Sequence, residues 1–224
     1  MTLRAQLHET LGQAAAFLGA VTLVLGTAGA AGHRPPPPNA APAGPDSAVY
    51  RILPVSRLIV TTGKAGLFGF AGHSHQIQAR EFSGVVVYYA GNPTASRVEL
   101  RIATHSLEVL TPNDTAEIRK VTASMRNDVL RTVQHPEITL ISRSVTPTAT
   151  GFYLLAMLTL AGRTREIPID VGAVMGADTL RATAAFSVKQ SDFGITPYRG
   201  GPGGTVAVAD RVRFGIDIVA VRAP

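Results

Sequence analysis

Cysteine is absent from this sequence of 224 residues. Its absence excludes a disulfide framework, a zinc site built on thiolates, a thiol nucleophile and the lipid-modified cysteine of a bacterial lipoprotein. Charge is also scarce, because charged residues make up 16% of the chain whereas hydrophobic residues make up 46%. A chain of this length and composition is typical of a folded domain with a substantial core rather than of a disordered protein.

The sequence signatures of catalysis are missing as well. The chain has no Gly-x-Ser-x-Gly nucleophile turn and no His-Glu-x-x-His zinc motif. Asp192-Phe193-Gly194 matches a kinase tripeptide, but neither the Gly-rich ATP loop nor the His-Arg-Asp catalytic loop accompanies it. With only 15 acidic residues, no pair of carboxylates can be assigned to a pocket. We therefore predict that the protein is not an enzyme and needs no cofactor.

Basic residues exceed acidic ones, which gives a net charge of +6. In the folded part they are scattered singly among apolar positions, without a basic run interleaved with aromatic residues. This pattern predicts no nucleic-acid partner. It predicts a modest attraction to anionic surfaces, so contact with a membrane surface is left open.

The first 31 residues have the order of a secretory signal. Arg4 lies near the start, an apolar run extends from Ala14 to Leu25, and the small residues Ala28-Gly29-Ala30 follow. The alternative is an N-terminal membrane anchor, because the apolar and small residues together approach the length that spans a bilayer. The small residues at the far end favour cleavage.

Residues 32–47 form a Pro/Ala-rich linker that includes four consecutive prolines at positions 35–38. Such a run joins neither a sheet nor a helix interior, so we predict an extended spacer. The remainder, residues 48–224, is predicted to form one β-barrel domain. With either a cleaved signal or an anchor, this domain is expected to be exported and to be periplasmic, secreted or held at the membrane by the N-terminal segment.

From residue 49 onward, apolar and polar residues alternate with period two. Val98, Leu100 and Ile102 lie on one face of a predicted strand, and Val212–Ile218 alternates in the same way. Residues 113–133 have helical spacing instead and predict one or two short helices. Eight to ten strands with short connections indicate an all-β antiparallel sandwich or closed barrel. Pattern alone leaves both a solid core and a hollow one open. The other predicted strands are Ser56–Thr62, Phe82–Tyr89, Glu137–Ser142, Gly151–Leu160, Arg165–Val171 and Leu180–Val188.

Gly72-His73-Ser74-His75 is the one short motif that suggests metal chemistry. On an extended segment His73 and His75 point the same way, so both imidazoles can meet one metal ion. A hydrolytic zinc site needs a third protein ligand, for which His105 and His135 are candidates. The alternative is a polar strand entrance with solvated or backbone-bonded histidines.

The chain from about Val49 to Val221 resembles the YceI family in the order and spacing of several segments. Ala161 stands where the family usually has His, and Lys189-Gln190 stands where it often has a polar residue followed by Arg. These two departures weaken any inference about contacts with a polar head group. The matching segments are Tyr50-Arg51-Ile52, Phe82–Val86, Ser96–Leu100, His135–Ser142, Leu158–Arg165, Ser191–Ile195 and Asp210–Ala220.

The resemblance implies an extended lipocalin-like barrel of eight antiparallel strands, usually exported, with polyisoprenoid compounds in the pore and no catalysis. We therefore expect an apolar, isoprenoid-like lipid in the lumen. Two other hypotheses remain: a metal-binding protein or metal-assisted hydrolase that uses His73 and His75, and a structural envelope module without a ligand. A homodimer is also left open. The residues expected to line the lumen and bind the lipid are Phe68, Phe70, Phe82, Val98, Leu100, Ile102 and Phe214.

Overall fold

The computed structural model describes residues 46–65, 74–111, 115–200 and 206–224. The predicted signal or anchor, and all but the last two residues of the predicted linker, therefore lie outside the described residues. The strands are β1 (Ser47–Ile52), β2 (Arg57–Ala65), β3 (Gln76–Ala79), β4 (Phe82–Tyr89), β5 (Arg97–Ala103), β6 (Leu107–Val109), β7 (Glu137–Thr148), β8 (Gly151–Leu160), β9 (Arg163–Met175), β10 (Thr179–Lys189), β11 (Arg199–Gly200) and β12 (Val206–Arg222).

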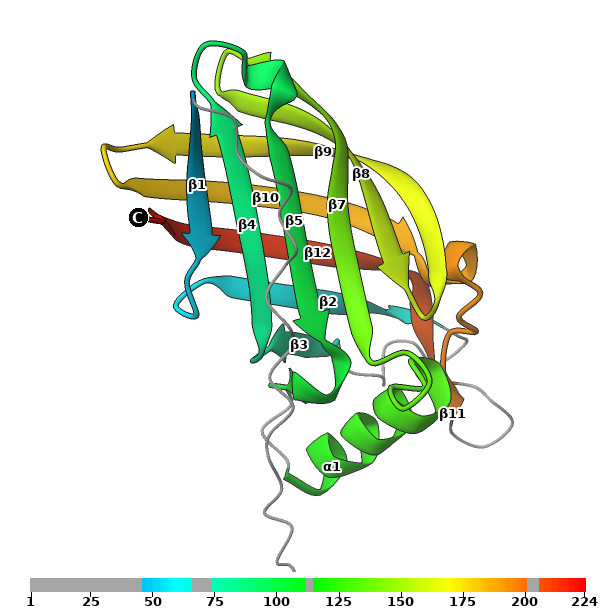
Figure 1. Ribbon diagram of the computed structural model, residues 1–224. Coiled ribbons are helices and arrows are strands. Elements are labelled where there is room, and N and C mark those ends of the chain that lie inside the picture. The colour runs from blue at the N-terminus through cyan, green and yellow to red at the C-terminus, as the bar shows by residue number, and fades with distance from the viewer. Residues whose placement is uncertain (1–45, 66–73, 112–114, 201–205) are drawn as a thin grey trace, which may run out of the picture. The chain divides into compact units, whose positions relative to one another are not determined.

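Eight of these strands close into an antiparallel barrel in the order β1-β4-β5-β7-β8-β9-β10-β12 (Figure 1). The seam is the pairing of β1 with the end of β12, where Tyr50 lies opposite Arg222 and Ile52 opposite Ala220. The prediction of an all-β, eight-stranded barrel is confirmed. Closure removes the exposed strand edges that an open sheet would present to other chains.

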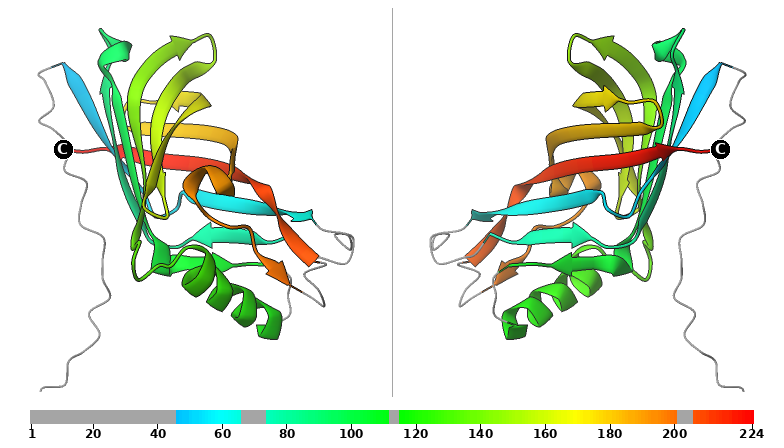
Figure 2. Two further views of the ribbon diagram at one scale, coloured as in Figure 1. Left: turned by 90° about the vertical axis from the view of Figure 1, so that its right-hand side faces the viewer. Right: turned by 90° about the vertical axis from the view of Figure 1, so that its left-hand side faces the viewer.

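Strands β2, β3 and β6 extend the wall of the barrel at one end. β12 pairs with β2, β2 with β3, and β3 with β6. Only a few residues separate β1 from β2, β3 from β4, and β5 from β6. The two members of each pair are therefore the halves of one bent strand, and the bends give the long, curved wall seen in Figure 2.

Ser56 replaces ladder hydrogen bonds at the bend between β1 and β2. Its hydroxyl accepts a hydrogen bond from the Val219 amide at 3.0 Å and donates one to the Val219 carbonyl at 3.1 Å. The Leu53 amide also donates to that carbonyl, at 2.8 Å. Ser56 is buried, so these bonds satisfy β12 backbone groups that would otherwise lack a hydrogen-bond partner at the point where β12 stops pairing with β1 and begins to pair with β2.

Period-two alternation fixes which side chains face the lumen. On β5, Leu100 is 4% exposed and lies opposite Leu140 of β7, which in turn lies opposite Leu158 of β8. Burying a side chain of this size contributes about 1.5–3 kcal/mol relative to leaving it exposed. The intervening Glu99 and Arg101 form an ion pair at 2.6 Å, as expected for the wet face.

The turn between β8 and β9 has a conformation that its sequence only partly suits. Leu160 pairs with Arg163, which leaves the two-residue loop Ala161-Gly162. Both residues have positive φ, 48° for Ala161 and 74° for Gly162. This is the geometry of a type I′ hairpin turn, which favours Asn-Gly or Gly-Gly. The Cβ of Ala161 therefore imposes local strain in this turn.

The predicted helical region forms a single short helix, α1 (Thr115–Ser124), continued by one π-helical turn (Met125–Val129). The Leu130 amide donates to the Met125 carbonyl at 2.9 Å, and Arg131 then takes a left-handed φ of 48°. α1 lies across one end of the barrel, next to β6 (Figures 1 and 2). In the described part of the chain, no helix combines the length and the apolar character that crossing a membrane requires.

Candidate functional site: the barrel lumen

Aromatic and aliphatic side chains pack across the end of the barrel away from α1. Tyr50, Leu180 and Ala220 form a small buried cluster, all at most 4% exposed, against which Tyr88 and Met175 pack. The Tyr88 ring also meets the Phe152 ring edge-on, with centroids 6.1 Å apart. We call the end of the barrel that this cluster occupies the closed end.

The lumen next to the closed end contains an apolar cavity of about 100 Å³, which we call the inner cavity. Its lining comes from facing strands of the barrel, and the residues in it that carry a hydroxyl are Tyr88, Ser96 and Thr183. The apolar lining includes Ile52, Val86, Leu140, Leu154, Ile169 and Ala184.

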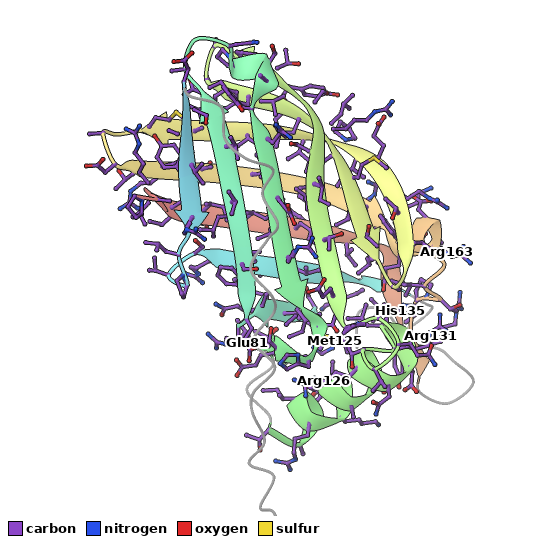
Figure 3. All side chains as sticks on the ribbon, viewed as in Figure 1. Glu81, Met125, Arg126, Arg131, His135 and Arg163 are labelled. Carbon is purple, nitrogen blue, oxygen red and sulfur yellow. The ribbon has the colours of Figure 1, made fainter. Side chains whose placement is uncertain are left out.

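A larger cavity of about 430 Å³ lies toward α1, and we call it the helix-end cavity. Its walls include β2, β3, β12 and the helical segment, with Val121 of α1 and the buried Met125 of the π-helical turn. Figure 3 shows Met125 at the base of the barrel, where the helical segment meets the wall. This volume lies within the range of about 300–1,000 Å³ typical of small-molecule sites.

Among the described residues, Ile216 is the one that lines both cavities. Ile216 lies on β12 between Leu58 of β2 and Ala184 of β10. Ile216 therefore lies at the boundary between the smaller inner cavity and the larger cavity under α1, and we call this boundary the waist.

The predicted lumen residues divide between the two cavities. Val98 and Leu100 line the inner cavity, whereas Ile102 and Phe214 line the helix-end cavity. Phe82 lies opposite Ile102 and packs against the core without lining either cavity. Phe68 and Phe70 lie outside the described residues. Ligand contact by all of these residues stays a prediction.

Several lining residues were not anticipated from the sequence. Leu58 and Val60 of β2 line the helix-end cavity, and so does Ile59 between them, so the three consecutive apolar residues offer no alternation that would have indicated the lumen face. Val121, Met125 and Val129 also line it. Their spacing predicted a helix, but helical spacing does not tell which part of a barrel the helix will cover.

His75, Thr62 and Gln190 are buried polar residues of the helix-end cavity, each at most 9% exposed. The Thr62 hydroxyl accepts a hydrogen bond from the His75 amide at 3.1 Å. His75 Nδ1 lies 2.8 Å from the Thr111 carbonyl oxygen. Gln190 Nε2 donates to the Ala209 carbonyl at 2.9 Å. Protein backbone therefore holds all three side chains in place.

A family model that describes a YceI-like domain matches residues 50–220. The chain belongs to the YceI-like family. Among curated proteins, none matches it in sequence.

Solved structures with the same architecture support the fold. BcnA from Burkholderia cenocepacia is 15% identical with a TM-score of 0.58, over 73% of this chain and 95% of that one. A polyisoprenoid-binding domain from Saccharophagus degradans, implicated in plant cell wall breakdown, is 14% identical with a TM-score of 0.54, over 78% and 98%. The YceI protein of Campylobacter jejuni is 15% identical with a TM-score of 0.51, over 66% and 85%. At these identities the likeness establishes the fold alone.

The histidines proposed for a metal site are only partly described. His73 lies outside the described residues, whereas His75 faces the helix-end cavity. The Nε2 atom of His105 lies 3.4 Å from Oε2 of Glu81, and the His135 ring packs against Gly162. Figure 3 shows Glu81 and His135 on different sides of the helix end. Among the residues that the structure describes, His, Cys, Asp and Glu side chains nowhere gather in a group of three or more that would hold a metal ion.

Proposed function

We propose that this YceI-like protein is an exported carrier that holds an apolar, isoprenoid-like lipid in its barrel lumen. The observation that carries the proposal is the pair of largely apolar cavities, of about 430 and 100 Å³, that have Ile216 in common. Most wall residues of both cavities are apolar, which suits a hydrocarbon chain.

Hydrophobic burial suffices for binding without a strong polar anchor. Each methylene-sized group removed from water contributes about 0.8 kcal/mol. Several isoprene units therefore exceed the association cost, which is about 4–15 kcal/mol. The same lipid is also stable in a bilayer, so its net preference for the barrel is small. A small preference suits pick-up from one membrane and delivery to another better than permanent storage.

Two further lines support the proposal. The chain belongs to the YceI-like family, and the Saccharophagus degradans domain of the same fold binds polyisoprenoids. The sequence also lacks the nucleophile, metal and cofactor motifs expected of a hydrolase or a transferase. Carriage rather than catalysis is therefore the proposed activity.

Organic extraction followed by mass spectrometry tests carriage. The full chain is purified from a host that makes isoprenoid lipids, and the extract is compared with that of an unrelated exported protein purified in parallel. We expect a species with an isoprenoid tail in near-stoichiometric amount. Repeated preparations without any apolar molecule would count against the proposal.

Export is tested separately, because it depends on residues 1–31. Fractionation of a cell that expresses the full chain, with the intact mass of the recovered protein, distinguishes a cleaved signal from a retained anchor. We expect the protein outside the cytoplasm and shortened near the Ala28-Gly29-Ala30 segment. Full-length protein that stays in the cytoplasm would contradict export.

A further inference from the structure

The exposure of the residues that line the helix-end cavity locates its mouth. Lining residues of the barrel wall such as Leu58 and Ile138 are at most 7% exposed. Lys120 of α1 also lines the cavity but is exposed, and Tyr198, just before β11, is 40% exposed. Residues that line a cavity and also contact water lie where it opens. The mouth therefore lies between α1 and β11, which occupy the same end of the barrel (Figures 1 and 2).

The strand ladder is interrupted on this side of the barrel. β6 pairs with β3, and β11 pairs with β12. Within the described residues no ladder joins β6 to β11. α1 lies next to β6, and none of its own residues is buried. A weakly packed helix rather than backbone hydrogen bonds therefore borders the mouth, so a ligand can enter here without the breaking of a sheet.

Basic side chains surround the mouth. Lys120 reaches it from α1, and the exposed Arg199 of β11 directly follows Tyr198. The exposed Lys64 of β2 lies opposite Val208, whose side chain lines the cavity. The Val208 amide in turn donates to the Tyr198 carbonyl at 3.0 Å, so these segments are adjacent. We call Lys64, Lys120, Tyr198 and Arg199 the mouth surface.

The three cations of the mouth surface are not neutralised by the protein. Elsewhere Arg101 forms an ion pair with Glu99 at 2.6 Å. Within the described part of the chain, no carboxylate lies within ion-pair distance of any of the three cations. Glu117 is the acidic residue among the described residues of the lining. Three positive charges less one negative charge leave a net charge of +2 at the mouth.

Tyr198 adds an interfacial aromatic ring to this charge. Tyrosine has an apolar ring and a polar hydroxyl, and it is enriched at the head-group level of membranes. Anionic head groups attract basic residues that lie close to the bilayer surface. A lipid that leaves a bilayer also needs an apolar route, because its tail is poorly soluble in water. A mouth that is pressed against the bilayer provides that route directly into the cavity.

We infer that the mouth surface docks on a bilayer that contains anionic phospholipids. This inference rests on the proposed function, because the docked mouth is where the carried lipid exchanges with the membrane. Lys64, Lys120 and Arg199 bind head-group phosphates, and the Tyr198 ring lies at the head-group level. The closed end then points away from the membrane.

Vesicle binding tests the docking surface. The full chain is sedimented with vesicles of phosphatidylcholine alone or of phosphatidylcholine with roughly 30% phosphatidylglycerol. Each basic residue at an anionic surface strengthens binding by about fivefold, so three should give a preference for the anionic vesicles of about a hundredfold. In 1 M NaCl the preference should disappear, because the Debye length falls to about 3 Å.

Charge variants locate the surface. The triple variant Lys64→Gln, Lys120→Gln and Arg199→Gln should lose the preference for anionic vesicles. The control variant Arg51→Gln, Arg181→Gln and Arg222→Gln removes the same charge from exposed positions beside the closed end, and its preference should change by less than about threefold. All variants share one N-terminal segment, so its contribution to vesicle binding cancels.

A tryptophan probe reports the contact itself, because the chain contains no tryptophan. The emission of Tyr198→Trp should shift to shorter wavelength when anionic vesicles are added, since the ring leaves water. Val174→Trp is the control, because Val174 is 71% exposed and lies opposite Arg181 near the closed end. Its emission should not shift.

The outcomes separate docking from carriage. Equal binding to the two kinds of vesicle, equal losses in the two triple variants, or a shift for Val174→Trp but not for Tyr198→Trp overturns the docking surface. Tighter binding to soluble polyglutamate than to anionic vesicles also overturns it, in favour of an acidic protein partner. All of these results leave carriage standing if lipid is extracted. Vesicle binding without any extractable lipid overturns carriage and leaves the docking surface in place.

Discussion

Ala184 lies on the inward face of β10 and lines the inner cavity, opposite Ile216 at the waist of the lumen. The inner cavity has a volume of about 100 Å³. A methylene group occupies roughly the same space as a water molecule, about 30 Å³, so the cavity accepts about three such groups. Ala184→Leu adds three carbon atoms at this place and should fill the space that a ligand tail would use.

The size of the effect follows from the lost burial. Three methylene-sized groups at about 0.8 kcal/mol each correspond to about 2.4 kcal/mol, or an affinity loss of about 60-fold. The loss should appear only for tails long enough to pass Ile216. Shorter tails remain in the helix-end cavity and should bind the variant as they bind the wild type.

A chain-length series measures this directly. Geraniol, farnesol and geranylgeraniol are titrated against the wild type, Ala184→Leu and the control Ala185→Leu, which makes the same exchange on the exposed outer face of β10. The affinity of Ala184→Leu should stop rising at a shorter tail than that of the other two proteins. Equal affinities of Ala184→Leu and the wild type for every tail would refute the assignment of the inner cavity as the tail site.

The remaining predictions concern stability. Ser56→Ala should lower the free energy of unfolding by about 1–3 kcal/mol in a urea titration, because the buried β12 amide that donates to the Ser56 hydroxyl loses its acceptor; no change would refute the role of this bond at the seam. Ala161→Asn should raise the free energy of unfolding by about 1 kcal/mol, because Asn tolerates the positive φ before Gly162, and a lower value would contradict the turn assignment. The Ser191 hydroxyl and amide donate to the Asp210 carboxylate and hold the pKa of that carboxyl below the usual 3.8. The contribution of this carboxylate to folding stability is therefore present above pH 3.8 and is lost as the pH falls through the lowered pKa. Asp210→Asn should remove that part of the acid dependence of the free energy of unfolding, and identical pH profiles of variant and wild type would contradict the assignment.

Local pattern was sufficient to predict most of the strands. Alternation identified Val98, Leu100 and Ile102 as one face, and the structure places all three on the lumen lining because a barrel wall has only two sides. Alternation does not give depth along the barrel axis. It therefore did not distinguish Val98, near the closed end, from Ile102, near α1.

Contacts between distant parts of the chain were beyond the sequence pattern. The seam joins Tyr50 to Arg222, and the bond of Ser56 with Val219 spans 163 positions. No local propensity specifies such pairs, because closure depends on the length and bending of every strand between them. The His-x-His motif was also ambiguous, since two residues on one face of a strand can share a metal ion or border a pocket.

Electron density inside the lumen tests the central claim most directly. The protein is crystallised as purified from a host that makes isoprenoid lipids, without delipidation. The account predicts continuous elongated density that runs from beside His75, past Ile216, into the inner cavity next to Leu180. A lumen filled by inward-collapsed side chains, or one that holds only separate water peaks, would contradict it.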